Sequence, residues 1–138
     1  MGQSEEMHQL RVTPPDTESG TNIPAAVGTE TVTKICLCLT GATTGYWRDS
    51  VERNHRWIDM VELRVDLLEC VEQLAHEWES DRYGDLISQV ISELGALRRD
   101  TLSGIETILT CRRTADLGRF AGPEDCRCDL LARLVAAL

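Results

Sequence analysis

The apolar residues divide the chain into alternating strand-like and helix-like segments from about residue 34 onward. Residues 34–40 form a continuous apolar run of strand length that Gly41 closes, a pattern typical of a strand buried on both faces. Residues 60–65 and 106–111 have a similar length and predict a second and a third strand. Because each predicted strand precedes a helical segment, the expected order is strand then helix, three times over.

The helical segments are identified by apolar residues spaced three or four positions apart. This spacing is found in four segments: residues 44–56, 67–78, 83–97 and 122–138. We expect Gly95 and the Arg-Arg-Asp cluster after it to end the third segment, and Pro123 with the following acidic residues to begin the fourth. We expect three aromatic side chains to pack between helices and sheet: Trp47, Trp57 and Trp78.

Strands that alternate with helices favour a parallel sheet, whose ligands bind at the carboxyl ends of the strands. Residues 1–32 are rich in Thr, Ser, Pro, Gly and Glu and show neither the two-residue period of a strand nor the 3.6-residue period of a helix. This composition is typical of a flexible, disordered leader. The sequence therefore predicts one α/β domain over residues 33–138, preceded by a leader over residues 1–32.

Composition narrows the class of protein. With 138 residues, 42% of them hydrophobic and 27% charged, the chain has enough apolar material for one modest domain. A net charge of -9, with Lys34 as the only lysine, argues against nucleic-acid binding. We expect a cytoplasmic protein with no membrane contact and with reduced cysteines, because the sequence has no long apolar run and no secretion signal.

Charged residues interrupt the apolar runs of two predicted strands. Glu62, Arg64 and Asp66 alternate along the second strand and share one face, and Arg112 follows the third strand on the same face as Thr110. A buried charge without a partner is strongly unfavourable, so these residues predict a polar pocket at the strand ends. Carboxylates beside arginines would suit a small hydroxylated acid. A structural ion pair between Glu62 and Arg64 is the alternative.

Three blocks of the sequence occur in the order found in a known family: residues 34–41, 58–66 and 108–120. Together they resemble the type I 3-dehydroquinases (3-dehydroquinate dehydratases) of the shikimate pathway. The most specific part is an E-x-R-x-D strand followed by a T-x-R strand and a glycine loop, and the resemblance covers roughly residues 33–138.

The resemblance implies a partial (βα)8 barrel of the TIM type, consisting of its first three βα units, since such barrels need about 250 residues. It also implies dehydration of 3-dehydroquinate to 3-dehydroshikimate through a Schiff base on a lysine, with a histidine as general acid and base and no cofactor. The substrate-binding residues that it implies are Cys38, Glu62, Arg64 and Arg112.

The loop after the third strand departs from the family pattern. Asp116 stands where the family usually has Glu, and the resemblance implies a supporting role for it, oriented toward the catalytic histidine. Leu117 with Gly118 replaces a Gly-Gly pair, which bears on the loop geometry because only glycine enters the left-handed region freely.

The resemblance places the residues of the chemical step outside this sequence. The Schiff-base lysine and catalytic histidine of the family lie on strands later than the third, so we expect both beyond Leu138. Lys34 begins the first strand, a strand length away from the expected pocket, and cannot replace that lysine. His8 falls in the leader, while His55 and His76 fall on polar helical segments and are expected at the surface.

The expected partners are the small-molecule substrate and either a second copy of the chain or complementing C-terminal units. The alternative is a non-catalytic remnant that self-associates or binds a partner through its open sheet edges. A chain with no stable fold is a third hypothesis. Two Cys-x-Cys pairs, at residues 36–38 and 126–128, have a spacing that argues against a metal site, so buried free thiols are the simpler interpretation.

Overall fold

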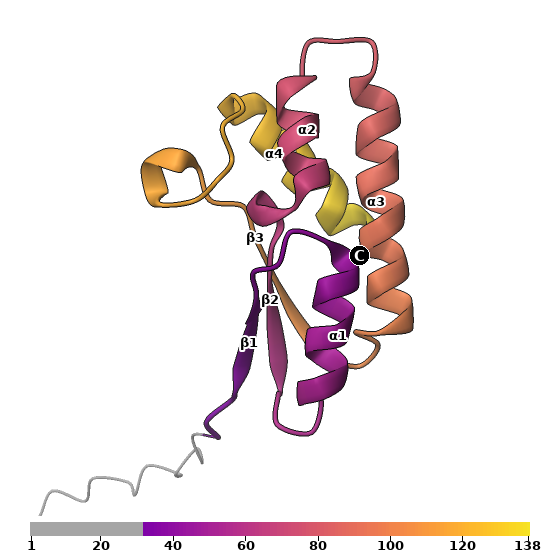
Figure 1. The fold of residues 1–138 in the computed structure, drawn as a ribbon, viewed down its shortest axis with the longest axis vertical. Helices are drawn as coiled ribbons and strands as arrows, with labels where there is room; N and C mark the ends of the chain where they lie inside the picture. The colour runs from indigo at the N-terminus through magenta and orange to yellow at the C-terminus, as the bar shows by residue number, and fades with distance from the viewer. Residues whose placement is uncertain (1–31) are drawn as a thin grey trace, which may run out of the picture. The chain divides into compact units, whose positions relative to one another are not determined.

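The computed structural model of the chain describes residues 32–138, so the leader expected at residues 1–32 lies almost wholly outside the described residues. The described part contains one parallel sheet with the strand order β1-β2-β3 (Figure 1). The strands are β1 (Cys36–Leu39), β2 (Met60–Arg64) and β3 (Glu106–Thr110). The expected order of parallel strands joined by helices is therefore present.

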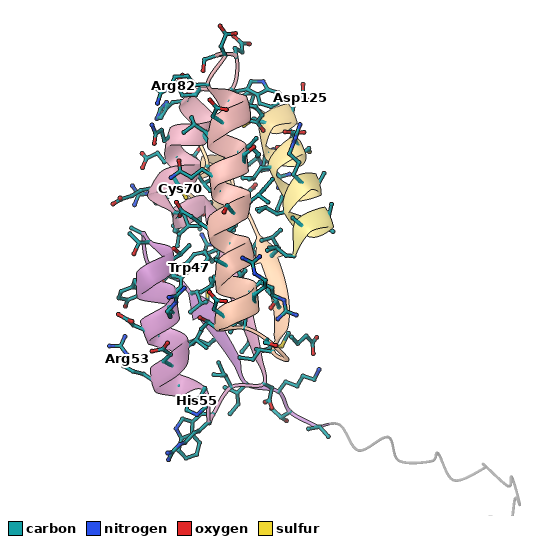
Figure 2. All side chains as sticks on the ribbon, turned by 90° about the vertical axis from the view of Figure 1, so that its right-hand side faces the viewer. Trp47, Arg53, His55, Cys70, Arg82 and Asp125 are labelled. Atoms are coloured by element: carbon teal, nitrogen blue, oxygen red, sulfur yellow. The ribbon has the colours of Figure 1, made fainter. Side chains whose placement is uncertain are left out.

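Four helices pack against a single face of this sheet, and Figure 2 shows α3 running the length of that layer. Their bounds are α1 (Thr44–Asn54), α2 (Glu69–His76), α3 (Tyr83–Asp100) and α4 (Glu124–Ala137). None of these helices is long and apolar enough to cross a bilayer. The result is a three-stranded, open α/β layer that agrees with part of a barrel.

The hydrophobic core lies between the helices and one face of the sheet. Many of its members are at most 2% exposed, and they come from the sheet and from all four helices; they include Leu39, Val61, Leu63, Trp47, Val51, Val71, Leu74, Ile87, Val90, Leu94, Leu97, Leu130 and Leu134. Leu39 of β1 pairs with Leu63 of β2 in the register, and residues paired across neighbouring strands share a face, so both point toward the helices. Alternation along each strand leaves the intervening strand residues on the opposite face.

The expectation that the first strand is buried on both faces is wrong. Leu39 is buried beneath the helices, but Cys36 and Cys38 are exposed on the other face. No helix of residues 32–138 covers that face. The continuous apolar run of β1 is therefore buried on one side only.

The third predicted helix ends within the expected Arg-Arg-Asp cluster. Helix α3 passes through Gly95 and ends at Asp100, three residues beyond the expected Leu97. Glycine costs about 1 kcal/mol in a helix interior relative to alanine. Here the apolar stripe continues to Leu97, which is buried, and this packing outweighs the propensity of one residue.

The tryptophans and cysteines only partly follow the prediction. Trp47 is fully buried and Trp78 packs edge-to-face against Tyr83, with ring centroids 4.8 Å apart, but Trp57 is 70% exposed in the turn before β2. All six cysteines are free, and the prediction of buried thiols is correct for Cys126 only among the Cys-x-Cys residues, because Cys36, Cys38 and Cys128 are exposed. Burial raises the pKa of Cys111, the residue directly after β3, to about 12.

Trp47 provides a test of this packing, because its indole Nε1 donates a hydrogen bond to the carbonyl of Gly41 at 2.8 Å. Trp47→Phe removes this bond and leaves a small void, so the free energy of unfolding should fall by about 1–3 kcal/mol in urea denaturation. Trp57→Phe is the matched control at an exposed position and should change it by less than about 0.5 kcal/mol. Equal losses in the two variants would contradict the assigned core.

Candidate functional site

The uncovered face of the sheet carries polar side chains from all three strands. The register places Cys38 of β1 beside Glu62 of β2, and Arg64 of β2 beside Thr110 of β3. Residues paired across neighbouring strands project to the same face, so these four side chains lie on one surface. Arg112 follows β3 by two residues and continues the face of Thr110.

Glu62 is at the centre of this surface and has contacts from both neighbouring strands. Arg112 Nη2 lies 3.6 Å from Glu62 Oε1, and the Glu62 side chain is only 20% exposed. The neighbouring Cys38 thiol lowers the pKa of Glu62, and the Thr110 hydroxyl and the charge of Arg112 add to this, so that partial burial is outweighed. Glu62 is therefore ionised at neutral pH and acts as an acceptor.

Cys38 has the complementary protonation state. Partial burial and the neighbouring Glu62 carboxylate raise the pKa of the Cys38 thiol above its ordinary value. The proton therefore stays on the sulfur at neutral pH, and the thiol lies beside the Glu62 carboxylate on the neighbouring strand. These contacts bring together three of the predicted substrate-binding residues: Cys38, Glu62 and Arg112.

Arg64, the fourth predicted substrate-binding residue, is held by Asp66. Arg64 Nε lies 3.0 Å from Asp66 Oδ1, and Nη2 lies 2.8 Å from Oδ2, a two-pronged pair in which the Asp66 side chain is 0% exposed. The expected alternative of an ion pair between Glu62 and Arg64 is thus replaced by two other pairs. Strand β2 ends at Arg64, and Asp66 lies in the 3-10 turn Val65–Leu67 rather than in the strand.

The protonation state of Asp66 follows from its bonds. Burial would raise the pKa of this carboxyl, but the Arg64 guanidinium and the backbone N–H groups of Arg112 and Arg119 hold it below its ordinary value. Asp66 is therefore ionised and fully paired, as a buried charge requires. Asp66 and Thr110 belong to the polar faces that the sequence predicts, but neither is among the substrate-binding residues that the resemblance implies.

The loop after β3 folds back on its own beginning. The amide of Phe120 donates to the carbonyl of Arg112 at 3.1 Å, and the amide of Gly118 donates to the carbonyl of Arg113 at 2.8 Å. A Cβ atom on Gly118 would lie 2.1 Å from the Arg112 carbonyl oxygen, so only glycine allows this close approach. The loop therefore fixes the backbone from which the Arg112 side chain extends.

Asp116 lies in this loop and has a different neighbour from the other predicted residues. It ends the 3-10 turn Thr114–Asp116, and its Oδ2 accepts from Arg113 Nε at 2.7 Å. Its side chain is half exposed and, within residues 32–138, makes no hydrogen bond or ion pair with Glu62, Arg64 or Arg112.

Lys34 and the two described histidines lie apart from this cluster. Lys34 precedes β1 and pairs with the carboxylate of Glu106 at the start of β3, at the amino ends of the strands. His55 lies at the end of α1 and is exposed near one end of the part that the structure describes, as Figure 2 shows, and His76 ends α2 with an exposed side chain. His8 lies outside the described residues.

The fold and the site define a class: an α/β protein with carboxylate and guanidinium groups gathered at the carboxyl ends of parallel strands, where such folds bind small polar ligands. A family model described as type I 3-dehydroquinase matches residues 35–138, a range that includes every strand and helix described above. The chain belongs to this family. No curated protein and no solved structure matches the chain.

Leu117 allows a test of the loop beside the site. It has φ 60°, in the left-handed region, and its side chain is 94% exposed. A residue with a Cβ atom pays about 1–2 kcal/mol in this conformation, so Leu117→Gly should raise the free energy of unfolding by about 1 kcal/mol. Chemical denaturation measures the change. Leu117→Ala is the control, because it removes the exposed side chain but keeps the strain, and a similar gain from it would contradict the explanation.

Proposed function

We propose that residues 32–138 form the substrate-binding part of a 3-dehydroquinate dehydratase of the shikimate pathway. The observation that carries this proposal is the contact of 3.6 Å between Glu62 of β2 and Arg112, two residues after β3, on an uncovered polar face. Membership in the type I 3-dehydroquinase family supports the choice of ligand. The substrate is a carboxylate with several hydroxyl groups, for which a guanidinium and an acceptor carboxylate are suitable partners.

Each residue of the cluster has a distinct proposed role. The Arg112 side chain is 47% exposed and keeps donors free for the ligand carboxylate or a hydroxyl. Ionised Glu62 accepts a hydrogen bond from a ligand hydroxyl, and Cys38 lies beside it at the same surface. Asp66 occupies Nε and Nη2 of Arg64, so Nη1 of Arg64 is the group offered to the ligand.

The dehydration step requires groups that this cluster lacks. We infer that the Schiff-base lysine and the proton-transferring histidine belong to units downstream of residue 138, which complete a (βα)8 barrel. This is supported by the position of Lys34, the only lysine of the sequence, which pairs with Glu106 at the amino ends of the strands. Asp116 on the exposed loop would then support the histidine of such a unit.

The binding role predicts a specific loss on mutation of Arg112. Arg112→Ala removes charge-assisted hydrogen bonds worth about 1.5–3 kcal/mol, so the affinity of the chain for 3-dehydroquinate should fall about ten- to hundredfold. Calorimetric or NMR titration measures the affinity. Arg53→Ala is the control, since Arg53 is an exposed arginine on α1 (Figure 2). Equal affinity of the Arg112 variant and the unmodified chain would refute the role of Arg112.

The same ligand tests the assignment of the chemical step. Dehydration of 3-dehydroquinate creates an enone whose absorbance can be followed directly. We expect no absorbance change with the 138-residue chain and a steady increase with a version extended downstream. Turnover by the short chain would show that the lysine assignment is wrong.

Self-association is the second candidate function, and it is favoured by the uncovered face. Ile108 on this face is 44% exposed, and within the described sheet β1 and β3 each have one edge without a partner strand. Exposed apolar side chains and open edges both favour association between chains.

Sedimentation velocity over a range of concentrations tests this second candidate. If the uncovered face is an interface, the sedimentation coefficient should rise with concentration, and Ile108→Thr should restore the monomer because it removes apolar contact area while keeping strand propensity. A monomer at every concentration would exclude this function.

A further inference from the structure

One buried carboxylate connects the two arginines of the candidate site. Asp66 lies in the 3-10 turn directly after β2, and its side chain is 0% exposed. It accepts hydrogen bonds from two nitrogens of Arg64 and from the backbone amide of Arg119 at 3.1 Å, and the nearby backbone amide of Arg112 helps to lower its pKa. Every one of these partners belongs to the strand end or the loop that forms the site.

The bonds to Arg64 fix the direction of its guanidinium. Two nearly parallel contacts of 3.0 and 2.8 Å hold the planar group in one orientation, which a single contact would not do. The Arg64 side chain remains 11% exposed, so part of it reaches the surface, whereas the Asp66 side chain is 0% exposed. Asp66 itself has no exposed surface and cannot touch a ligand.

The bond from the Arg119 amide fixes the loop that carries Arg112. Asp66 and Arg119 are 53 residues apart in sequence, so their contact ties the loop after β3 to the end of β2. The same loop closes through the bond from Phe120 to Arg112, and Gly118 packs directly against the Arg112 carbonyl. Anchoring at Asp66 therefore determines where the Arg112 side chain begins.

We propose that Asp66 is a positioning residue of the candidate site, which orients the Arg64 guanidinium and anchors the backbone of Arg112. It acts through the two arginines and makes no contact with substrate. Its effect on ligand affinity rests on the proposed function, but its effect on the two arginines does not require a ligand. A merely structural carboxylate would change stability and leave the geometry of the arginines unchanged.

Asp66→Asn tests this proposal, with Asp129→Asn as the matched control. Asp129 is a carboxylate of the helix layer that accepts from the Tyr83 hydroxyl at 2.6 Å and from Arg133 Nε at 2.8 Å. Both substitutions remove one negative charge and keep one side-chain oxygen that can accept a hydrogen bond. They differ in location, because Asp129 lies in α4 and its partners lie in α3 and α4.

The first readout is the NMR signals of the arginine side-chain Nε–H groups and of the backbone amides. In Asp66→Asn we expect the signals of Arg64 Nε–H and of the Arg112 and Arg119 amides to shift, whereas in Asp129→Asn they should stay in place. Unchanged signals in a folded Asp66→Asn protein would overturn the proposal.

The second readout needs no variant, so it decides the question even if Asp66→Asn does not fold. In the unmodified chain the Arg64 Nε–H and the Arg119 amide should exchange with solvent about tenfold more slowly than the Nε–H of exposed Arg53. Exchange of Arg64 as fast as that of Arg53 would overturn the proposal.

The third readout is affinity for 3-dehydroquinate, which separates this proposal from the one on function. We expect the affinity to fall about tenfold in Asp66→Asn and to stay within about twofold in Asp129→Asn. Binding that survives unchanged in Asp66→Asn would overturn the positioning role. If the unmodified chain does not bind the ligand, the proposed function fails, and shifted arginine signals still support the positioning role.

Discussion

The covering of only one face of the sheet is the constraint on which the remaining structure depends. Four helices bury one side of β1, β2 and β3, so strand residues alternate between a tightly packed core and an open surface. Leu63 is buried beneath the helices, while its neighbours Glu62 and Arg64 emerge on the other side. A parallel sheet normally needs cover on both faces, and here the second face carries charge instead.

The charges on this face are paired to different degrees, and burial explains the difference. Asp66 is completely enclosed, and it has several donors because an unpaired buried carboxylate would be strongly unfavourable. Arg112 is half exposed and has one longer contact, since water solvates the rest of its guanidinium. The tightly paired group is thus suited to hold the site together, and the loosely paired group is suited to meet a ligand.

Much of the fold could be predicted from the sequence because spacing reports which residues share a face. The register then placed Cys38 beside Glu62 and brought Arg112 to the same surface, as alternation had indicated. Periodicity could not reveal whether anything covers that surface, so the first strand was expected to be buried on both sides. It also placed Trp57 in the core, although the turn before β2 turns this side chain outward.

The pairing within the site was harder to predict, for a physical reason. Arg64 has a carboxylate two residues away on each side, Glu62 and Asp66, and sequence gives both an equal separation. The choice depends on the 3-10 turn after β2, which bends the chain so that Asp66 reaches the guanidinium from the buried side. The choice depends as well on the loop after β3, because its Arg119 amide donates to Asp66 from 53 residues away in the sequence.

The exposed thiol beside Glu62 has a consequence for the chemical durability of this surface. Oxidants and alkylating agents react with thiolates, and the raised pKa of Cys38 keeps its sulfur protonated at neutral pH. A smaller thiolate fraction means that Cys38 should react with such agents more slowly than an exposed cysteine whose pKa is at its ordinary value.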